Sequence, residues 1–140
     1  MRKTEKRYKI IPAILSLPKT IYFNFKVFPW RQAVKLPVII HYKTKVYKCS
    51  RGCVELPENA GFGLIKLGFG GTKQIIHQPY NVLYLEKGSK LIFHGKANVG
   101  EGFSISNEGK LELGKDLWLN KNAKLFCSHN VRLGDEVVVG

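Results

Sequence analysis

Acidic residues are scarce in the first part of this 140-residue sequence. Residues 1–54 contain 13 Lys and Arg but only one acid, Glu5, whereas residues 55–140 contain 10 basic and nine acidic residues. The formal net charge of +13 therefore comes almost entirely from the first part. Such a basic segment could contact anionic lipid head groups, nucleic acid or an anionic saccharide, or it could simply keep the protein soluble. Without a recognised motif, charge alone predicts no nucleic-acid partner.

Cysteine, methionine and long apolar runs are also scarce. Three cysteines, an odd number, do not form a disulfide framework, so a reducing cytoplasm is the simpler prediction. No run approaches the length of about 18 apolar residues that a membrane-spanning helix needs. The segment Ile10–Leu17 contains Pro12 and lacks a cleavage site, so no secretion signal is predicted. With one methionine and 14 glycines, long helices are not expected.

Aromatic and β-branched residues are frequent near the N-terminus. Segments 21–25, 27–30 and 38–42 read IYFNF, VFPW and VIIHY, which favours short strands interrupted by prolines. Glycines between residues 51 and 71 indicate tight turns. We therefore predict that residues 1–81 form an irregular, β-rich capping region.

From Leu83 onward, apolar residues fall mostly on odd positions. They form pairs spaced by one residue, the pairs repeat every six residues, and two extra residues follow each third pair. The full period is therefore 20 residues. The pairs lie at 91/93, 97/99 and 103/105, then at 111/113, 117/119 and 123/125, and then at 131/133 and 137/139. A pair at 83/85 is interpreted as the third pair of an earlier, less regular coil.

Three short strands per period predict a triangular solenoid whose paired apolar side chains point inward. The two extra residues, within 106–110 and 126–130, are expected to widen one corner. An up-and-down antiparallel sheet, the alternative, explains the alternation but not the steps of six and 20. A left-handed backbone conformation is expected at the small residues that follow the pairs, which are Gly100, Gly114, Asn120, Gly134 and Gly140.

This repeat resembles the hexapeptide-repeat motif of the left-handed β-helix acyltransferases. In Val99–Ser104, Leu113–Trp118 and Leu133–Val138, a small residue, two variable ones and another inward residue follow a large aliphatic residue. A softer resemblance, over Leu17–Phe25 and Leu67–Gly71, is to bacterial members that O-acetylate surface polysaccharides. The resemblance implies an all-β fold, a left-handed parallel β-helix. The left hand comes only from the resemblance, because general rules favour right-handed crossovers.

Similarity to this family implies acetyl-CoA as donor, a sugar hydroxyl as acceptor and a homotrimer with active sites between neighbouring prisms. A histidine acts as general base on the hydroxyl, and backbone N–H groups stabilise the oxyanion. In polysaccharide-modifying members this histidine follows an acidic corner, which counting coils places about ten residues beyond Gly140. The repeat over 82–140 is therefore expected to be incomplete at its C-terminal end, and this fragment is expected to show no catalytic turnover.

Catalytic and cofactor-binding residues are accordingly not assigned, although two residues are weak candidates. His129 lies in the same kind of corner as the expected base but one coil early and without acidic companions, and the alternative is a solvated loop histidine. In sugar acetyltransferases of this family an asparagine placed like Asn122 helps to hold the acceptor or the thioester, and the alternative is an ordinary polar edge residue. His94 is expected to be exposed, and no role is assigned to His41 or His77.

The remaining residues of interest are sulfur-containing and aromatic. Cys49 and Cys53 lie near His41 and could suggest zinc, but Cys127 alone does not supply a second ligand pair, so no metal is predicted. Cys127 shares the inward parity and is expected to be buried or at a corner. Trp118 has outward parity, which predicts a trimer contact or a sugar platform.

We therefore predict a cytoplasmic bacterial O-acetyltransferase that uses acetyl-CoA to modify a cell-surface saccharide or its precursor. Peripheral contact with the inner face of the membrane is expected through the basic N-terminal region. One alternative keeps the fold but changes the acceptor to serine, a nucleotide-sugar amine or a xenobiotic. Another is a non-catalytic binding or scaffold protein. A carbonic anhydrase of this fold needs three histidine ligands, and the repeat region offers only two.

Overall fold

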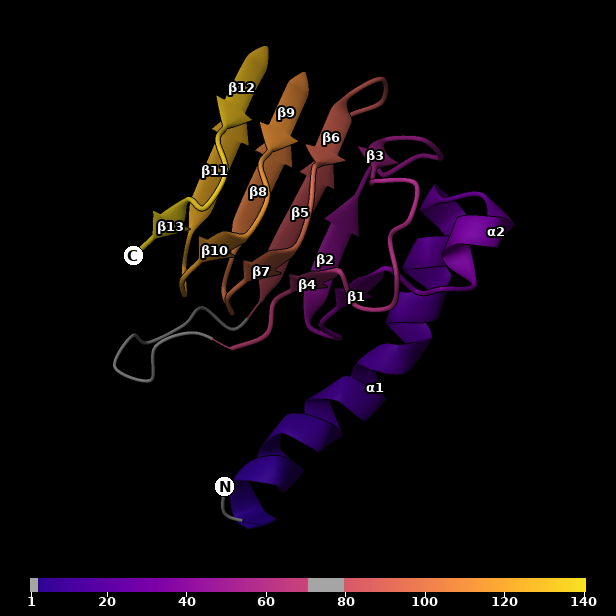
Figure 1. Ribbon diagram of the computed structural model, residues 1–140, viewed down its shortest axis with the longest axis vertical. Coiled ribbons are helices and arrows are strands. Elements are labelled where there is room, and N and C mark those ends of the chain that lie inside the picture. Colours follow the sequence, from indigo (N-terminus) through magenta and orange to yellow (C-terminus); the bar gives the residue numbers. More distant parts are fainter. Residues whose placement is uncertain (1–2, 71–79) are drawn as a thin grey trace.

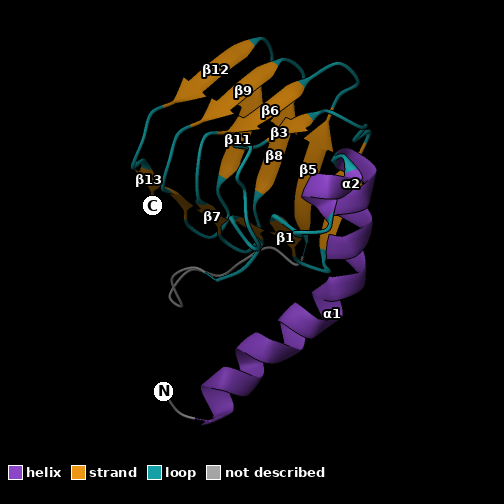
Figure 2. Cartoon of the chain, turned by 45° about the vertical axis from the view of Figure 1, so that its right-hand side comes forward, coloured by secondary structure: helices purple, strands orange, loops and turns teal. Residues whose placement is uncertain are grey.

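A computed structural model describes residues 3–70 and 80–140 of the chain, with side chains from Ala13 onward. Two helices, α1 (Lys3–Val27) and α2 (Trp30–Ala33), precede the short strands that make up the rest of the fold (Figure 1). The strands form three parallel sheets, which wrap the chain into a triangular β-helix (Figures 1 and 2).

Each sheet is one face of the prism, and successive strands of the chain move from face to face. Face 1 contains β1 (Val38–Ile40), β4 (Ile65–Leu67), β7 (Ala97–Val99), β10 (Leu117–Leu119) and β13 (Val138–Val139). Face 2 contains β2 (Thr44–Tyr47), β5 (Asn81–Leu85), β8 (Ser104–Asn107) and β11 (Lys124–Cys127). Face 3 contains β3 (Val54–Glu55), β6 (Lys90–Phe93), β9 (Lys110–Leu113) and β12 (Asn130–Leu133).

The register confirms the 20-residue period. On face 3, Leu91 pairs with Leu111, and Leu111 pairs in turn with Val131, all in parallel. On face 2, Leu83 pairs with Ile105, so the pair at 83/85 does belong to an earlier coil. The antiparallel alternative is therefore wrong, because every strand pair among the described residues is parallel.

The coils begin well upstream of residue 82, inside the range predicted as a cap. Val38 pairs with Ile65 on face 1, and Val46 pairs with Leu83 on face 2. These first coils escape the sequence pattern because their connections are longer than those of the later coils, so the spacing of 20 is lost while the stacking remains.

Inward-pointing side chains fill the tube. In every complete coil, both apolar side chains of a pair are removed from water. This burial is the main favourable contribution to the free energy of forming a parallel sheet of short strands. The largest fully buried side chains of the repeat are Leu83, Leu85, Leu91, Phe103, Ile105, Leu111, Leu113 and Leu117.

The two extra residues of each coil do not widen a corner, contrary to expectation. They extend the strands of face 2, so that β8 runs to Asn107 and β11 to Cys127 before a short turn. Asn107 is fully buried and donates to the Lys90 carbonyl oxygen at 2.7 Å, while its Oδ1 accepts from the Gly109 N–H. Cys127 pairs with Asn107 and is likewise buried, as predicted.

The expected left-handed conformation occurs two residues later than predicted. Asp116, Asn122 and Glu136 have φ of 57°, 62° and 58°, whereas Gly114 is absent from the residues of positive φ. The corner glycine is instead required for close approach of the coils. A Cβ added to Gly114 would overlap the carbonyl group of Gly134 in the next coil.

The N-terminal region is helical, so the strands predicted over 21–25 and 27–30 are wrong. α1 spans 25 residues and includes Pro12 and Pro18, despite the expectation that long helices would be absent. Local propensity favoured strands there, but tertiary contacts override propensity. The contacts in question are between α1 and the first strand of face 1.

Three polar side chains of α1 hydrogen-bond to the free edge of β1 and to Tyr42 just after it. Asn24 Nδ2 donates to the Val38 carbonyl oxygen at 2.7 Å, and Asn24 Oδ1 accepts from the Val38 N–H at 3.2 Å. Thr20 Oγ1 donates to the Ile40 carbonyl oxygen at 3.2 Å and accepts from the Ile40 N–H at 3.1 Å. Ser16 Oγ accepts from the N–H of Tyr42 at 2.9 Å.

This match has a simple geometric origin. Four residues along a helix advance by about 6 Å, and two residues along a strand advance by about 6.6 Å. Side chains at 16, 20 and 24 therefore meet the outward peptide groups of residues 42, 40 and 38 in turn. We call these three residues the polar ladder. It satisfies an edge that would otherwise be unpaired.

We expect Gly114→Ala to lower the free energy of unfolding by about 2 kcal/mol, because the new methyl group forces two backbones apart. Gly134→Ala is the matched control, since a Cβ there meets nothing within 4 Å. Its effect should stay within about 0.5 kcal/mol. Urea unfolding followed by circular dichroism measures both, and equal losses would contradict the close-approach argument.

We expect Asn24→Leu to cost about 3 kcal/mol, because it leaves the Val38 N–H and carbonyl without partners while keeping the side-chain volume. Asn98→Leu, on the outward side of β7, is the control and should be close to neutral. The same unfolding measurement applies. If both variants unfolded alike, the polar ladder would not hold α1 on the tube.

Candidate functional site

The two weak candidates, Asn122 and His129, and the exposed His94 lie at three different corners of the prism. Asn122 is in the turn between β10 and β11, and His129 is in the turn between β11 and β12. His94 follows β6, at the corner where face 3 leads to face 1. The structure therefore separates these residues within one chain and does not assemble them into one constellation.

His129 and Asn122 both serve the backbone of their corners. The carbonyl oxygen of His129 accepts a hydrogen bond from the Lys110 N–H at 2.8 Å, and His129 is an exposed residue. Asn122 takes a positive φ, which asparagine tolerates better than most residues. Its N–H donates to the Glu101 carbonyl oxygen at 2.9 Å. These contacts show structural uses and leave the proposed catalytic roles as predictions.

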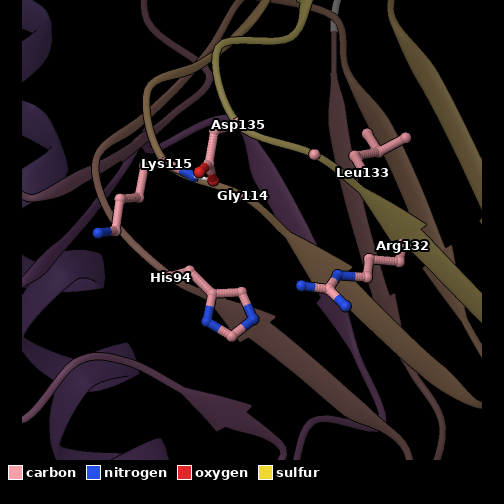
Figure 3. A pocket seen from close by; sticks show the side chains of 7 residues that line it. His94, Gly114, Lys115, Arg132, Leu133 and Asp135 are labelled. Carbon is pink, nitrogen blue, oxygen red and sulfur yellow. Dashed lines mark hydrogen bonds between the residues drawn. The ribbon is translucent and has the colours of Figure 1, made fainter.

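A pocket of about 270 Å³ lies at the corner between faces 3 and 1, and we call it the corner pocket (Figure 3). Its side chains come from three successive coils, with His94 from one, Lys115 from the next, and Arg132 and Asp135 from the last. Gly114 and Gly134 form its floor of backbone, together with Leu133. The Asp135 carboxylate accepts the Lys115 N–H at 2.8 Å, which ties two coils together beside the pocket.

Charges around the corner pocket favour an anionic ligand. Lys115 and Arg132 bring two positive charges against the single carboxylate of Asp135. On the neighbouring strand, Glu112 pairs with Lys110 at 3.2 Å and with Arg132 at 3.6 Å. The hydrogen bond from Lys110 is the main reason why the pKa of Glu112 is lowered, and the charges of Arg132 and His94 add to it. Glu112 therefore stays ionised and orients Arg132.

The sequence contained a signal for this pocket that the analysis of single residues missed. Positions 94, 114 and 134 are separated by the 20-residue period, so they form one column at one corner. The next column, 115 and 135, adds Lys115 and Asp135. Reading the polar residues by column, as was done for the apolar ones, would have brought His94 and Lys115 together.

Cys49 and Cys53 form a buried pair in the loop between β2 and β3. Their sulfur atoms lie 3.0 Å apart. The hydrogen bond from Cys49 lowers the pKa of Cys53 to about 7, against the opposing effect of burial, and the same bond raises the pKa of Cys49. Among the described residues, no group of three His, Cys, Asp or Glu side chains is placed to hold a metal ion.

His41 is a packing residue near the start of the tube. Its ring stacks on Tyr42, with centroids 4.5 Å apart, and meets Phe69 edge-on at 5.1 Å. Its Nδ1 accepts from the Lys43 N–H at 3.1 Å. His77, the fourth histidine, lies outside the described residues.

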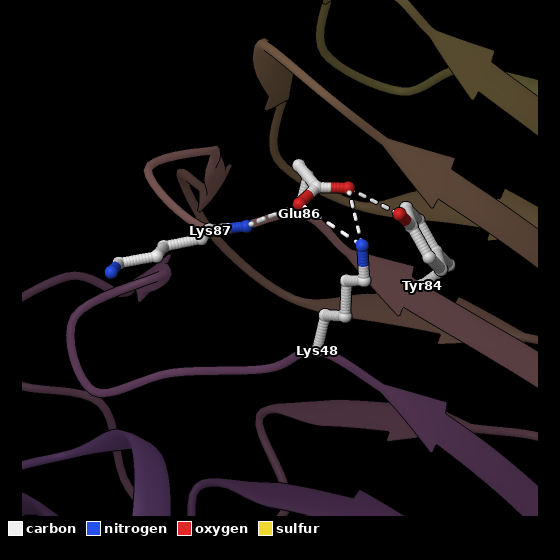
Figure 4. A network of polar contacts seen from close by, with 4 residues as sticks. All are labelled: Lys48, Tyr84, Glu86 and Lys87. Carbon is white, nitrogen blue, oxygen red and sulfur yellow. Dashed lines mark hydrogen bonds and ion pairs between the residues drawn. The ribbon is translucent and has the colours of Figure 1, made fainter.

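A surface cluster of Lys48, Tyr84 and Glu86 links the first two coils (Figure 4). The Glu86 carboxylate accepts from the Tyr84 hydroxyl and lies 3.5 Å from the Lys48 ammonium. The Tyr84 hydrogen bond is the main cause of the lowered pKa of Glu86, and the pKa of Lys48 is raised. Both groups therefore keep their charges near neutral pH, which suits a clamp between coils and not a proton-transfer site.

Comparison with known proteins adds no family assignment: no family model, curated protein or solved structure matches the chain. Chemistry must therefore be argued from the tube, the corner pocket and the residues that line it.

We expect the Cys53 thiol to ionise with a midpoint near pH 7, because the hydrogen bond from Cys49 stabilises its thiolate. Since an unfolded thiol has a pKa of about 8.5, this thiolate stabilises the fold at high pH, and the stabilisation is lost as the pH falls through 7. Thiolate absorbance at 240 nm should show the step. Cys53→Ser should remove it, Cys49→Ala should move it upward, and Cys127→Ser should leave it unchanged; a step near 7 in Cys53→Ser would refute the assignment.

Proposed function

We propose that this protein is an acetyl-CoA-dependent O-acetyltransferase of the hexapeptide-repeat family that modifies a cell-surface saccharide or its precursor. The observation that carries the proposal is the triangular parallel β-helix with a 20-residue register over Leu91, Leu111 and Val131. It is the architecture that the hexapeptide resemblance implies. A fold alone does not determine function, so the site must supply the rest of the argument.

The corner pocket is the proposed binding site for the anionic part of the donor. Coenzyme A carries phosphate groups, and Arg132 can bind a phosphate through two parallel hydrogen bonds. Lys115 adds a second positive charge from the preceding coil. A volume of about 270 Å³ suits a diphosphate or a similar fragment and not the whole donor.

The transfer itself needs a base that removes the proton of the sugar hydroxyl before the oxygen attacks the thioester carbonyl. Within the chain, His129 and His94 are the two testable candidates for this base. His94 has the better position of the two, since it lines the corner pocket.

The proposal includes a homotrimer in which neighbouring prisms pack face to face. Trp118 points outward from β10, as its parity predicted, and is 41% exposed. On the same face it pairs with Val138, which is also exposed. An exposed tryptophan beside an exposed valine on a flat sheet is typical of a contact surface.

A non-catalytic scaffold is the second candidate function. The separation of Asn122, His129 and His94 onto three corners favours it, because an isolated imidazole without an orienting partner is a weak basis for catalysis. The two candidates differ in one property that is simple to measure: the first requires binding of coenzyme A, and the second does not.

We expect acetyl-CoA to bind the protein, as measured by titration calorimetry, and Arg132→Gln to weaken binding at least about tenfold, because one phosphate contact of about 1.4 kcal/mol is lost. Arg31→Gln, the same change at an exposed arginine of α2, is the control and should leave binding unchanged. Lack of binding would support the scaffold.

Thiol release with acetyl-CoA and varied sugars follows turnover in the same samples. The chain is expected to bind the donor and, because His94 and His129 lie at separate corners, to turn it over slowly or not at all. If turnover is measured, His94→Asn and His129→Asn will show which histidine is the base.

A further inference from the structure

Helix α1 buries a row of polar side chains and leaves most of its described apolar side chains in solvent, although Phe23 and Val27 are buried in the core. The polar ladder of Ser16, Thr20 and Asn24 is fully or almost fully buried against β1. On the opposite side, Ile14 and Phe25 are 58% and 41% exposed. A helix on the surface of a water-soluble domain normally has the reverse arrangement.

The exposed apolar residues form one continuous band, which we call the outward stripe: Ile14, Leu15, Leu17, Ile21, Tyr22 and Phe25. Their spacings of three and four residues place them on a single side of the helix. Nearby, Trp30 at the start of α2 is 67% exposed. A contiguous patch of this kind marks a surface that binds something less polar than water.

Positive charge accompanies the outward stripe. Lys26 Nζ lies 5.7 Å from the centroid of the Tyr22 ring, and Arg31 Cζ lies 5.8 Å from that of Trp30. No Asp or Glu occurs between residues 13 and 54. The band therefore combines apolar and aromatic side chains with cations and lacks opposing carboxylates.

This combination identifies the occupant as the surface of an anionic bilayer. Aliphatic side chains enter the acyl boundary, Tyr and Trp rings favour the head-group level, and Lys and Arg reach lipid phosphates. Among the described residues, no helix has the length and apolar character needed to cross a membrane. The N-terminal half of α1 also projects beyond the tube, so the sheets leave that half uncovered (Figures 1 and 2).

We propose that α1 lies in the plane of an anionic membrane surface, with the outward stripe toward the lipid and the polar ladder toward the tube. Lys26 and Arg31 then contact lipid phosphates. The polar ladder fixes α1 rigidly to β1, so membrane binding orients the whole prism. This proposal stands independently of acetyl transfer, since none of its residues lines the corner pocket.

Vesicle binding tests the proposal directly with the full chain. Sedimentation with phosphatidylcholine vesicles, with or without one third phosphatidylglycerol, measures partition, and Trp30 emission in a Trp118→Phe background reports insertion. The anionic vesicles should bind at least tenfold more tightly than the neutral ones and shift Trp30 emission to the blue. Ile21→Ser with Phe25→Ser should weaken binding at least tenfold.

The matched control is Phe62→Ser with Phe126→Ser, which changes two other apolar residues that are 71% and 66% exposed. It should bind anionic vesicles like the parent protein. A separate pair, Lys26→Gln with Arg31→Gln, should weaken binding to anionic vesicles only. Circular dichroism checks that each variant keeps its fold, as expected for exposed positions.

Three results would overturn the proposal. The parent protein could fail to bind anionic vesicles, or the stripe variant could bind as the control does. In the third, light scattering would show self-association that the stripe variant loses while vesicle binding persists, which would make a second copy of the chain the occupant. Loss of acetyl-CoA binding in Arg132→Gln leaves this test unaffected, so failure of either proposal can be distinguished from failure of the other.

Discussion

Parallel hydrogen bonding between successive coils is the constraint on which the rest of the structure depends. The strands are short, and each complete coil must present its peptide groups to the coil before it and the coil after it. That requirement fixes the coil length at 20 residues from Leu91 onward and keeps the inward apolar side chains on one parity. It also brings the backbones so close at the corners that Gly114 has no room for a side chain. It also aligns equivalent residues of successive coils in columns, and two neighbouring columns contribute to the corner pocket.

The same constraint creates a free edge where the stack begins, and α1 satisfies it with side chains instead of a strand. Four helical residues and two strand residues advance by nearly the same distance. Ser16, Thr20 and Asn24 can therefore bond to alternate residues along β1 and just beyond it. Because Ser16, Thr20 and Asn24 occupy much of the buried side of α1, most of its described apolar residues lie on the exposed side. The edge solution and the membrane-facing surface are therefore two consequences of one arrangement.

Periodicity predicted the part of the fold where each side chain has one repeated environment. The burial of Cys127 and the outward direction of Trp118 could be predicted from parity, and the tube over 82–140 from the steps of six and 20 residues. The earlier coils could not, because their irregular connections hide the period. α1 was missed because its helix is determined by partners in β1, which no local pattern contains. The corner pocket combines residues from three coils. His94 could not be assigned to a site from the sequence, because its neighbours in the pocket, Lys115 and Arg132, come from the next two coils.

The register of the coils is the central claim, and methyl nuclear Overhauser contacts in protein labelled at Leu and Val measure it most directly. Stacked parallel coils predict cross-peaks between Leu91 and Leu111, between Leu111 and Val131, and between Val99 and Leu119. Absence of these three cross-peaks, with contacts between neighbouring strands of hairpins in their place, would contradict the tube and every functional inference drawn from it.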